Sequence, residues 1–190
     1  MNKTLKKVVL ALVVIPVLVV VASFFLPSNY RVERALVMKA GAEAVFMQIS
    51  TPKTWPEWTA WTVAKYPDLK YSFAGPEAGA GASYSWTGQS SGSGSLKITL
   101  AEPAKRIEYT LDFENGKHVS TGAIVIDPVE GGVKVTWHNT GSMGGNPVSR
   151  ILGLLMDRML GPDFEEGLRK LKERVESKSA VLRRRNGDAS

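Results

Sequence analysis

The chain contains no cysteine and only two histidines, His118 and His138. The lack of cysteine excludes disulfide bonds, thiolate metal ligands and a cysteine nucleophile. Two imidazoles are too few for a metal site built from several histidines. Each histidine is expected at the surface, because His138 follows Trp137 on an alternating strand and His118 follows an Asn-Gly turn. We therefore expect no metal, no cofactor and no catalytic residue.

Charged residues are missing between Val8 and Leu26, a run of nineteen apolar or small residues. A helix of this length can cross a hydrocarbon core of about 30 Å. The lysines before the run favour an N-terminus in the cytoplasm and an exported domain. Residues 1–27 are therefore predicted to form a signal anchor, which is a transmembrane helix. The alternative is a signal peptide that is cleaved near residues 21–23.

The charge excess of the chain is small, since 24 lysines and arginines stand against 18 aspartates and glutamates. The basic residues of the last helix alternate with acidic ones, so the sequence predicts no nucleic-acid partner. The glycines of residues 79–81 and 92–94 precede strands rather than helices, which favours hairpin turns over phosphate loops. Residues 28–178 are predicted to form one domain, and residues 179–190 a disordered basic tail.

Alternating apolar residues predict an antiparallel sheet of seven strands, one face buried and one wet. Two short helices are expected between the first and second strands, within residues 42–49 and 51–61. On the sixth strand the buried set is either Val119, Thr121, Ala123 and Val125, or the neighbours Ile124 and Ile126. Strand charges such as Arg34 are expected on or near the wet face. The strands are predicted over residues 30–39, 69–73, 82–86, 96–100, 107–113, 119–126 and 133–138.

Residues 147–176 predict a long helix that ends the domain. Ile151, Leu154, Leu155 and Met159 recur at helical spacing. After a break at Gly161-Pro162, the same spacing continues through Phe164, Leu168, Leu171 and Val175. The apolar face of this helix must be buried against another element, and the sheet is expected to bury it. Two arrangements satisfy this need, namely a solid core without a site and a sheet–helix pair that encloses a cavity.

Aromatic residues are the strongest indication of a ligand site. Three tryptophans lie in the second short helix and the loop after it, near the expected cavity mouth. A further set of rings shares inward parity on the strands. Large rings can line a cavity or simply fill the core. The predicted ligand-binding residues are Trp55, Trp58, Trp61, Tyr84, Trp86, Tyr109, Phe113, Trp137, Phe164 and Leu168.

Particular segments carry a family resemblance, namely VERALVMKAGAEAVF, WPEWTAW, GAGASYSWTG, GSGSLKITLAEPAKRIEYTLDF, GGVKVTWHNTG and GPDFEEGLRKLKERVE. Together they span roughly residues 30–176 and resemble the START-like superfamily, also called SRPBCC, and within it the bacterial polyketide cyclase/dehydrase group. The resemblance implies an α+β helix-grip fold, in which a curved antiparallel sheet wraps the C-terminal helix and leaves an apolar cavity. In a bacterium, the anchor would place this domain on the periplasmic side of the inner membrane.

The resemblance does not select one function, because members of the superfamily carry lipids, sense hormones, cyclise polyketides or serve oxygenases. The first hypothesis is a membrane-tethered domain that binds a small hydrophobic molecule, such as a lipid or polyketide-like compound. A cyclase- or dehydratase-like enzyme is the alternative, and it requires an ionisable group inside the cavity. A third hypothesis is an envelope protein-interaction module, which an exposed apolar patch of several hundred Å² would favour.

Overall fold

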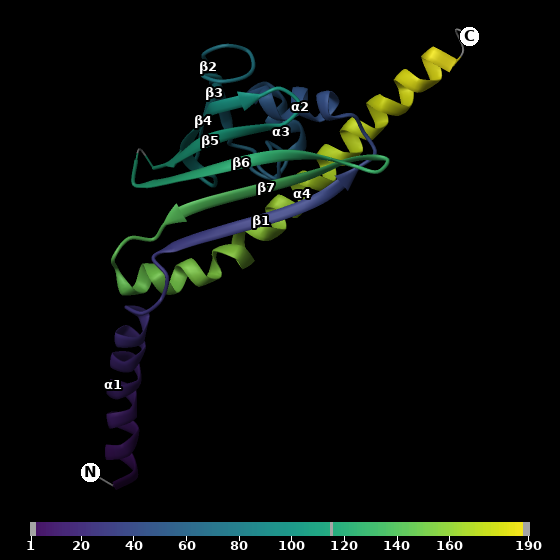
Figure 1. The fold of residues 1–190 in the computed structure, drawn as a ribbon. Coiled ribbons are helices and arrows are strands. Elements are labelled where there is room, and N and C mark those ends of the chain that lie inside the picture. The colour runs from purple at the N-terminus through teal and green to yellow at the C-terminus, as the bar shows by residue number, and fades with distance from the viewer. Residues whose placement is uncertain (1–2, 115, 188–190) are drawn as a thin grey trace.

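The computed structural model describes residues 3–114 and 116–187 of the chain (Figure 1). Helix α1 projects away from a domain in which a sheet lies along the long helix α4. The elements in chain order are α1 (Lys3–Ser23), β1 (Asn29–Met38), α2 (Ala42–Ser50), the 3-10 helix η1 (Pro52–Thr54), α3 (Trp55–Trp58), β2 (Lys70–Ala74), β3 (Ser83–Gly88), β4 (Gly92–Glu102), β5 (Arg106–Phe113), β6 (His118–Val129), β7 (Gly132–Ser142) and α4 (Pro147–Gly187).

Within the described residues the strands form one seven-stranded sheet in the order β1-β7-β6-β5-β4-β3-β2. Every neighbouring pair is antiparallel, so β2 to β7 form a meander, and β1 closes one edge by pairing with β7. The predicted strands and the two short helical segments, α2 and η1–α3, are confirmed. A seven-stranded antiparallel sheet with a long C-terminal helix fits the helix-grip fold.

The core lies between the inner face of the sheet and the second half of α4. Phe164, Leu168, Leu171 and Val175 of α4 are all buried there. The ring of Phe164 stacks on the inward ring of Trp137, with centroids 4.0 Å apart and planes 9° apart. On β6 the inward side chains are those at even positions, including Ile124 and Ile126, which resolves the choice that the sequence left open.

Helix α4 continues through the predicted break, with Pro162 inside it. Proline removes one backbone N–H and bends a helix, but tertiary packing on both sides can keep the turns helical. Figure 1 shows α4 changing direction between its green and yellow parts. The restart that Gly161-Pro162 predicted is therefore a bend. The same helix extends to Gly187, where the sequence predicted a disordered tail from residue 179; residues 188–190 lie outside the described residues.

The first half of α4 does not present its predicted apolar face to the sheet. Leu154, Leu155 and Met159 are exposed, and the side chains that face inward are Met156 and Leu160. The prediction was wrong because apolar residues occur on several sides of this segment. Periodicity therefore does not select one face.

Arg34 of β1 joins the two halves of α4, although it was expected near the wet face. Its guanidinium binds Asp157 of the first half, with Nη1 2.7 Å from Oδ1. It also binds Glu165 of the second half, with Nε 2.6 Å from Oε1. A Cβ at Gly161 would overlap the guanidinium, so the glycine makes room for this bridge at the bend.

Helix α1 contacts the domain near the start of α4. Arg150 donates from Nη1 to the carbonyl oxygens of Phe24 and Leu26, at 2.6 and 3.2 Å. Most apolar side chains described between Leu10 and Phe25 are exposed. In the part of the chain that the structure describes, no helix combines the length and apolar character needed to cross a membrane. The predicted transmembrane helix over residues 1–27 is thus not supported.

Candidate functional site

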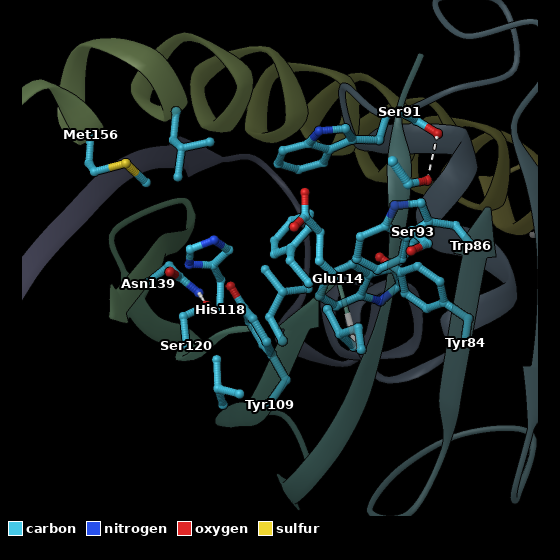
Figure 2. Close-up of a pocket in the computed structure, with 18 of the residues that line it drawn as sticks. Tyr84, Trp86, Ser91, Ser93, Tyr109, Glu114, His118, Ser120, Asn139 and Met156 are labelled. Carbon is cyan, nitrogen blue, oxygen red and sulfur yellow. Dashed lines mark hydrogen bonds between the residues drawn. The ribbon is translucent and has the colours of Figure 1, made fainter. Parts of the chain in front are cut away.

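A cavity of about 410 Å³ lies between the inner face of the sheet and the first half of α4. Figure 2 shows residues of the sheet on one side of this space and Met156 of α4 on the other. Exposed residues where β5 ends and β6 begins, among them Glu114 and His118, form an opening of the cavity to solvent. The lining residues are Tyr30, Trp55, Trp61, Leu69, Tyr71, Tyr84, Trp86, Ser91, Gly92, Ser93, Leu96, Tyr109, Leu111, Phe113, Glu114, His118, Val119, Ser120, Trp137, Asn139, Ser142, Met143, Met156, Leu160 and Phe164.

The structure brings most of the predicted ligand-binding residues around this cavity. The members that line it are Trp55, Trp61, Tyr84, Trp86, Tyr109, Phe113, Trp137 and Phe164. Trp58 and Leu168 lie in the core outside the lining. The Trp58 ring packs between Trp55 and Trp137, with ring centroids 5.0 and 5.4 Å away. The tryptophans were also expected near the mouth, but Trp55 and Trp58 are deeply buried. Their role in binding a ligand stays a prediction.

Edge-to-face contacts between rings build the apolar end of the cavity. Trp86 of β3 meets Phe113 of β5, with centroids 5.1 Å apart and planes at 78°. Tyr84 meets Tyr71 of β2 in the same way, with centroids 5.7 Å apart and planes at 66°. Such pairs hold each ring in one orientation, because the electropositive edge of one ring attracts the face of the next. The walls of this end are therefore held in place by contacts between their own rings.

Glycines on neighbouring strands let rings lie flat over the sheet. Each of these glycines is the cross-strand partner of an aromatic residue, and a Cβ added to it would overlap that ring. The ring therefore covers the backbone of the next strand instead of standing away from it, which leaves open space above. The pairs are Tyr30 with Gly141, Trp86 with Gly94, and Tyr109 with Gly122.

A buried polar cluster occupies the other end of the cavity. The Tyr30 hydroxyl donates to Asn139 Oδ1, and Asn139 Nδ2 donates to Ser120 Oγ, both at 3.2 Å. Trp137 Nε1 donates to the Tyr109 hydroxyl oxygen at 2.8 Å. Burial raises the pKa of Tyr109 to about 12 and also raises the pKa of Tyr30, so both phenols stay protonated near neutral pH.

Sequence reasoning missed this cluster, although one signal was present. Asn139 lies two residues after the inward Trp137 and therefore shares its parity. Ser120 is at an even position of its strand, like Ile124 and Ile126. The sequence left open whether the even or the odd positions of that strand point inward. Tyr30 comes from a strand 109 positions away from Asn139, and no local pattern relates the two.

Two ionisable side chains border the mouth of the cavity. Glu114 and His118 flank the β5–β6 turn, and Figure 2 shows both beside the cavity, with His118 near Tyr109 and Ser120. His118 is exposed, as expected, but the sequence did not place it at a site. His138 does not line the cavity and is half-buried. Its pKa is lowered mainly by this burial and next by the positive charge of Arg31. Among the described residues, no cluster of three or more His, Cys, Asp or Glu is arranged to hold a metal ion.

Comparisons with known proteins support the fold. Residues 30–176 match the family described as "Polyketide cyclase / dehydrase and lipid transport". No curated protein matches the chain in sequence. Solved structures similar to this chain share its fold at low sequence identity, as three of them illustrate.

The di-domain ARO/CYC protein StfQ of the steffimycin biosynthetic pathway is 13% identical with a TM-score of 0.61; the match covers 80% of this chain and 52% of StfQ. Protein CV1439 of Chromobacterium violaceum is 19% identical with a TM-score of 0.52, over 79% of this chain and 99% of that one. Protein MLL2253 of Mesorhizobium loti is 18% identical with a TM-score of 0.55, over 76% of this chain and 97% of that one.

Proposed function

We propose that this chain, which belongs to the polyketide cyclase/dehydrase and lipid transport family, binds a small hydrophobic molecule in its cavity. The observation that carries the proposal is the cavity of about 410 Å³, which is walled by aromatic and aliphatic side chains and open at one end. Cavities of a few hundred Å³ with a few converging polar groups are the usual form of small-molecule sites. The family description, which names polyketide cyclases and lipid transport, supports a polyketide-like compound or a lipid as the bound molecule.

Extraction of the purified full-length protein tests this proposal directly. Mass spectrometry of the extract is expected to find an apolar compound at near-stoichiometric amount. A hydrophobic dye should bind the extracted protein and be displaced when that compound is returned. Protein from which no compound is recovered, and which binds neither dye nor lipid, would contradict the proposal.

A matched pair of variants shows whether the dye occupies the cavity. Leu111→Trp adds volume inside it, because Leu111 lines the cavity. Thr121→Trp places the same ring on the next strand, at an exposed position on the other face. We expect dye binding to fall at least tenfold in the first variant and to stay within twofold in the second. Equal loss in both variants would place the dye elsewhere.

A second candidate is a cyclase- or dehydratase-like enzyme acting on the bound molecule. The observation that favours it is the pair Glu114 and His118 at the cavity mouth, since catalysis of this type needs an ionisable group within reach of the substrate. Glu114→Gln and His118→Asn are expected to leave binding within about threefold and to abolish turnover. A double variant that converts a substrate at the wild-type rate would exclude a role for either side chain.

Membrane attachment is a separate part of the proposal. We infer that α1 tethers the domain to the periplasmic side of a bacterial inner membrane, with the N-terminus in the cytoplasm. The support is the exposed apolar surface of α1, where Phe25 is 87% exposed, and the lysines before it. Because the chain has no cysteine, a single exposed Lys105→Cys gives a clean labelling site. Labelling by an impermeant reagent in intact cells supports this topology, and recovery of the protein in the soluble fraction after lysis contradicts it.

A further inference from the structure

The polar end of the cavity contains a network of hydrogen bonds between inward-facing side chains. Tyr30 donates to Asn139, and Asn139 donates to Ser120. Asn139 is 2% exposed and Ser120 is 7% exposed, so these bonds replace water at a buried position. The hydroxyl hydrogen of Tyr30 is used within this network.

The Tyr109 hydroxyl lies beside this network but keeps its own hydrogen (Figure 2). Its oxygen accepts from Trp137 Nε1 at 2.8 Å, and among the described residues no acceptor takes its hydrogen. A phenol carries one hydrogen, so that hydrogen remains for another partner. Bonds that a hydroxyl accepts polarise its O–H group and make it a better donor. The Tyr109 O–H is therefore a strengthened donor at the cavity wall.

The position of this donor is fixed on several sides. The Tyr109 ring is 2% exposed and covers Gly122, where any side chain would displace the hydroxyl. Trp137, which holds the oxygen, is itself held by its stacking on Phe164 of α4. Figure 2 shows Tyr109 with Ser120, Asn139 and His118 at one end of the cavity, and Tyr84 and Trp86 at the other. A donor held this firmly loses little entropy when it binds a ligand.

The charge of the lining restricts which oxygen this donor can meet. The described residues that line the cavity include no lysine or arginine, and the ionisable side chains Glu114 and His118 lie at the exposed mouth. A carboxylate or phosphate group held at Tyr109 would lose its hydration and gain no lysine or arginine in exchange. A carbonyl oxygen, which is neutral and a good acceptor, carries no such penalty.

We propose that Tyr109 is the specificity-determining residue of the cavity, and that its O–H binds the carbonyl oxygen of an uncharged, mainly apolar guest. The inference rests on the proposed function, because it assumes that the cavity holds a small molecule. It adds the chemical class of that molecule, a ketone- or quinone-like compound rather than a fatty acid or phospholipid. Gly122 is a positioning residue, because it acts on the ligand only through Tyr109. Trp137 holds the Tyr109 oxygen and also lines the cavity itself.

Fluorenone and fluorene test this inference, since they share one flat tricyclic skeleton and differ by the carbonyl oxygen. Equilibrium dialysis of the full-length protein, with the same detergent blank for every variant, gives the affinity for each. We expect wild type to bind fluorenone more tightly than fluorene. Tyr109→Phe keeps the ring and removes the hydroxyl. It should weaken the affinity for fluorenone about five- to tenfold and change the affinity for fluorene by less than twofold.

Tyr66→Phe is the matched control, because it removes a phenol hydroxyl from a half-buried ring that does not line the cavity. It should change the affinity for fluorenone by less than twofold. Fluorene carboxylate, at a pH where it is ionised, should bind at least tenfold more weakly than fluorenone. The inference is overturned if the carboxylate binds more tightly than fluorenone. It is also overturned if Tyr66→Phe weakens the affinity for fluorenone more than Tyr109→Phe does.

Infrared spectroscopy gives a readout that does not depend on the variant being stable. The carbonyl stretch of bound fluorenone should lie at lower frequency in wild type than in detergent alone, because a hydrogen bond weakens the C=O bond. A band unshifted in wild type overturns the inference while leaving the proposed function intact, provided that both probes bind. If neither probe nor dye binds the wild-type protein, the proposed function fails and this inference fails with it.

Discussion

The two halves of α4 place similar residues in opposite environments. In the second half, Leu168 is 1% exposed and packs into the core, whereas Met159 of the first half is 61% exposed. The second half carries charges on its remaining faces and so has one apolar side. The first half has apolar residues all round, of which only some face the sheet. The comparison teaches that one continuous helix can anchor the fold with one half and cover a cavity with the other.

The bend at Pro162 separates these roles. Arg34 binds an acidic residue on each side of it, Asp157 before and Glu165 after. The second half is held by buried apolar surface, which is worth about 25 cal/mol per Å². The first half is held largely by this exposed ion pair and by Met156 and Leu160 over the cavity. We therefore expect substitutions in the second half to affect stability and those in the first half to affect binding.

The largest effect should come from truncating the core of the second half. Leu168→Ala removes a buried side chain and leaves a cavity, which is expected to lower the free energy of unfolding by about 2–5 kcal/mol. Leu152→Ala makes the same change at an exposed position in the first half and should cost less than about 0.5 kcal/mol. Urea unfolding followed by circular dichroism measures both. Equal losses of unfolding free energy in the two variants would contradict the inferred difference between the two halves of α4.

Binding should separate adjacent residues of the first half. Leu160 lines the cavity and Met159 points outward. Leu160→Trp is expected to lower dye affinity at least tenfold, about 1.4 kcal/mol, while the free energy of unfolding changes by less than about 1 kcal/mol. Met159→Trp is the control and should leave the affinity within twofold. If Leu160→Trp instead unfolds the domain, the first half contributes more to stability than we infer.

Removing the ion pair at the bend should loosen one half more than the other. Arg34→Gln leaves Asp157 and Glu165 without their cation. Hydrogen exchange is expected to become roughly three- to tenfold faster across residues 147–160, where few buried contacts remain, and to change little across residues 164–176. Mass spectrometry of peptides from each half provides the measurement. Uniform acceleration along α4 would show that the halves open together.

The smallest effect is the dependence of this ion pair on pH. The guanidinium of Arg34 lowers the pKa of Asp157 below its ordinary value of 3.8. A carboxyl whose folded pKa is lowered stabilises the folded state above that ordinary value, and the contribution is lost as the pH falls through the folded pKa. The difference in exchange between wild type and Arg34→Gln should therefore be constant from about pH 7 to 5 and shrink below about pH 4. A difference that grows on acidification would contradict this assignment.

Local patterns predicted much of the candidate site. Alternation placed Tyr84, Trp86, Tyr109 and Trp137 on the inner face because successive side chains of a strand point to opposite sides. The apolar spacing from Phe164 to Val175 predicted the buried half of α4 for the equivalent helical reason. The same argument failed for Leu154, Leu155 and Met159, since a segment that is apolar all round has no preferred face. The glycines at 94, 122 and 141 were informative only together with the strand register.

Sequence by itself determined which side chains of each strand point inward and which half of the last helix is amphipathic, because both follow from the backbone geometry of single elements. The tertiary structure decided that a cavity remains, that rings lie over glycines of the next strand, and that Tyr30, Ser120 and Asn139 meet. These features depend on register and on the volume left between elements far apart in the chain. No short-range pattern encodes either quantity, and it is their combination that leaves the Tyr109 hydroxyl with a hydrogen to donate.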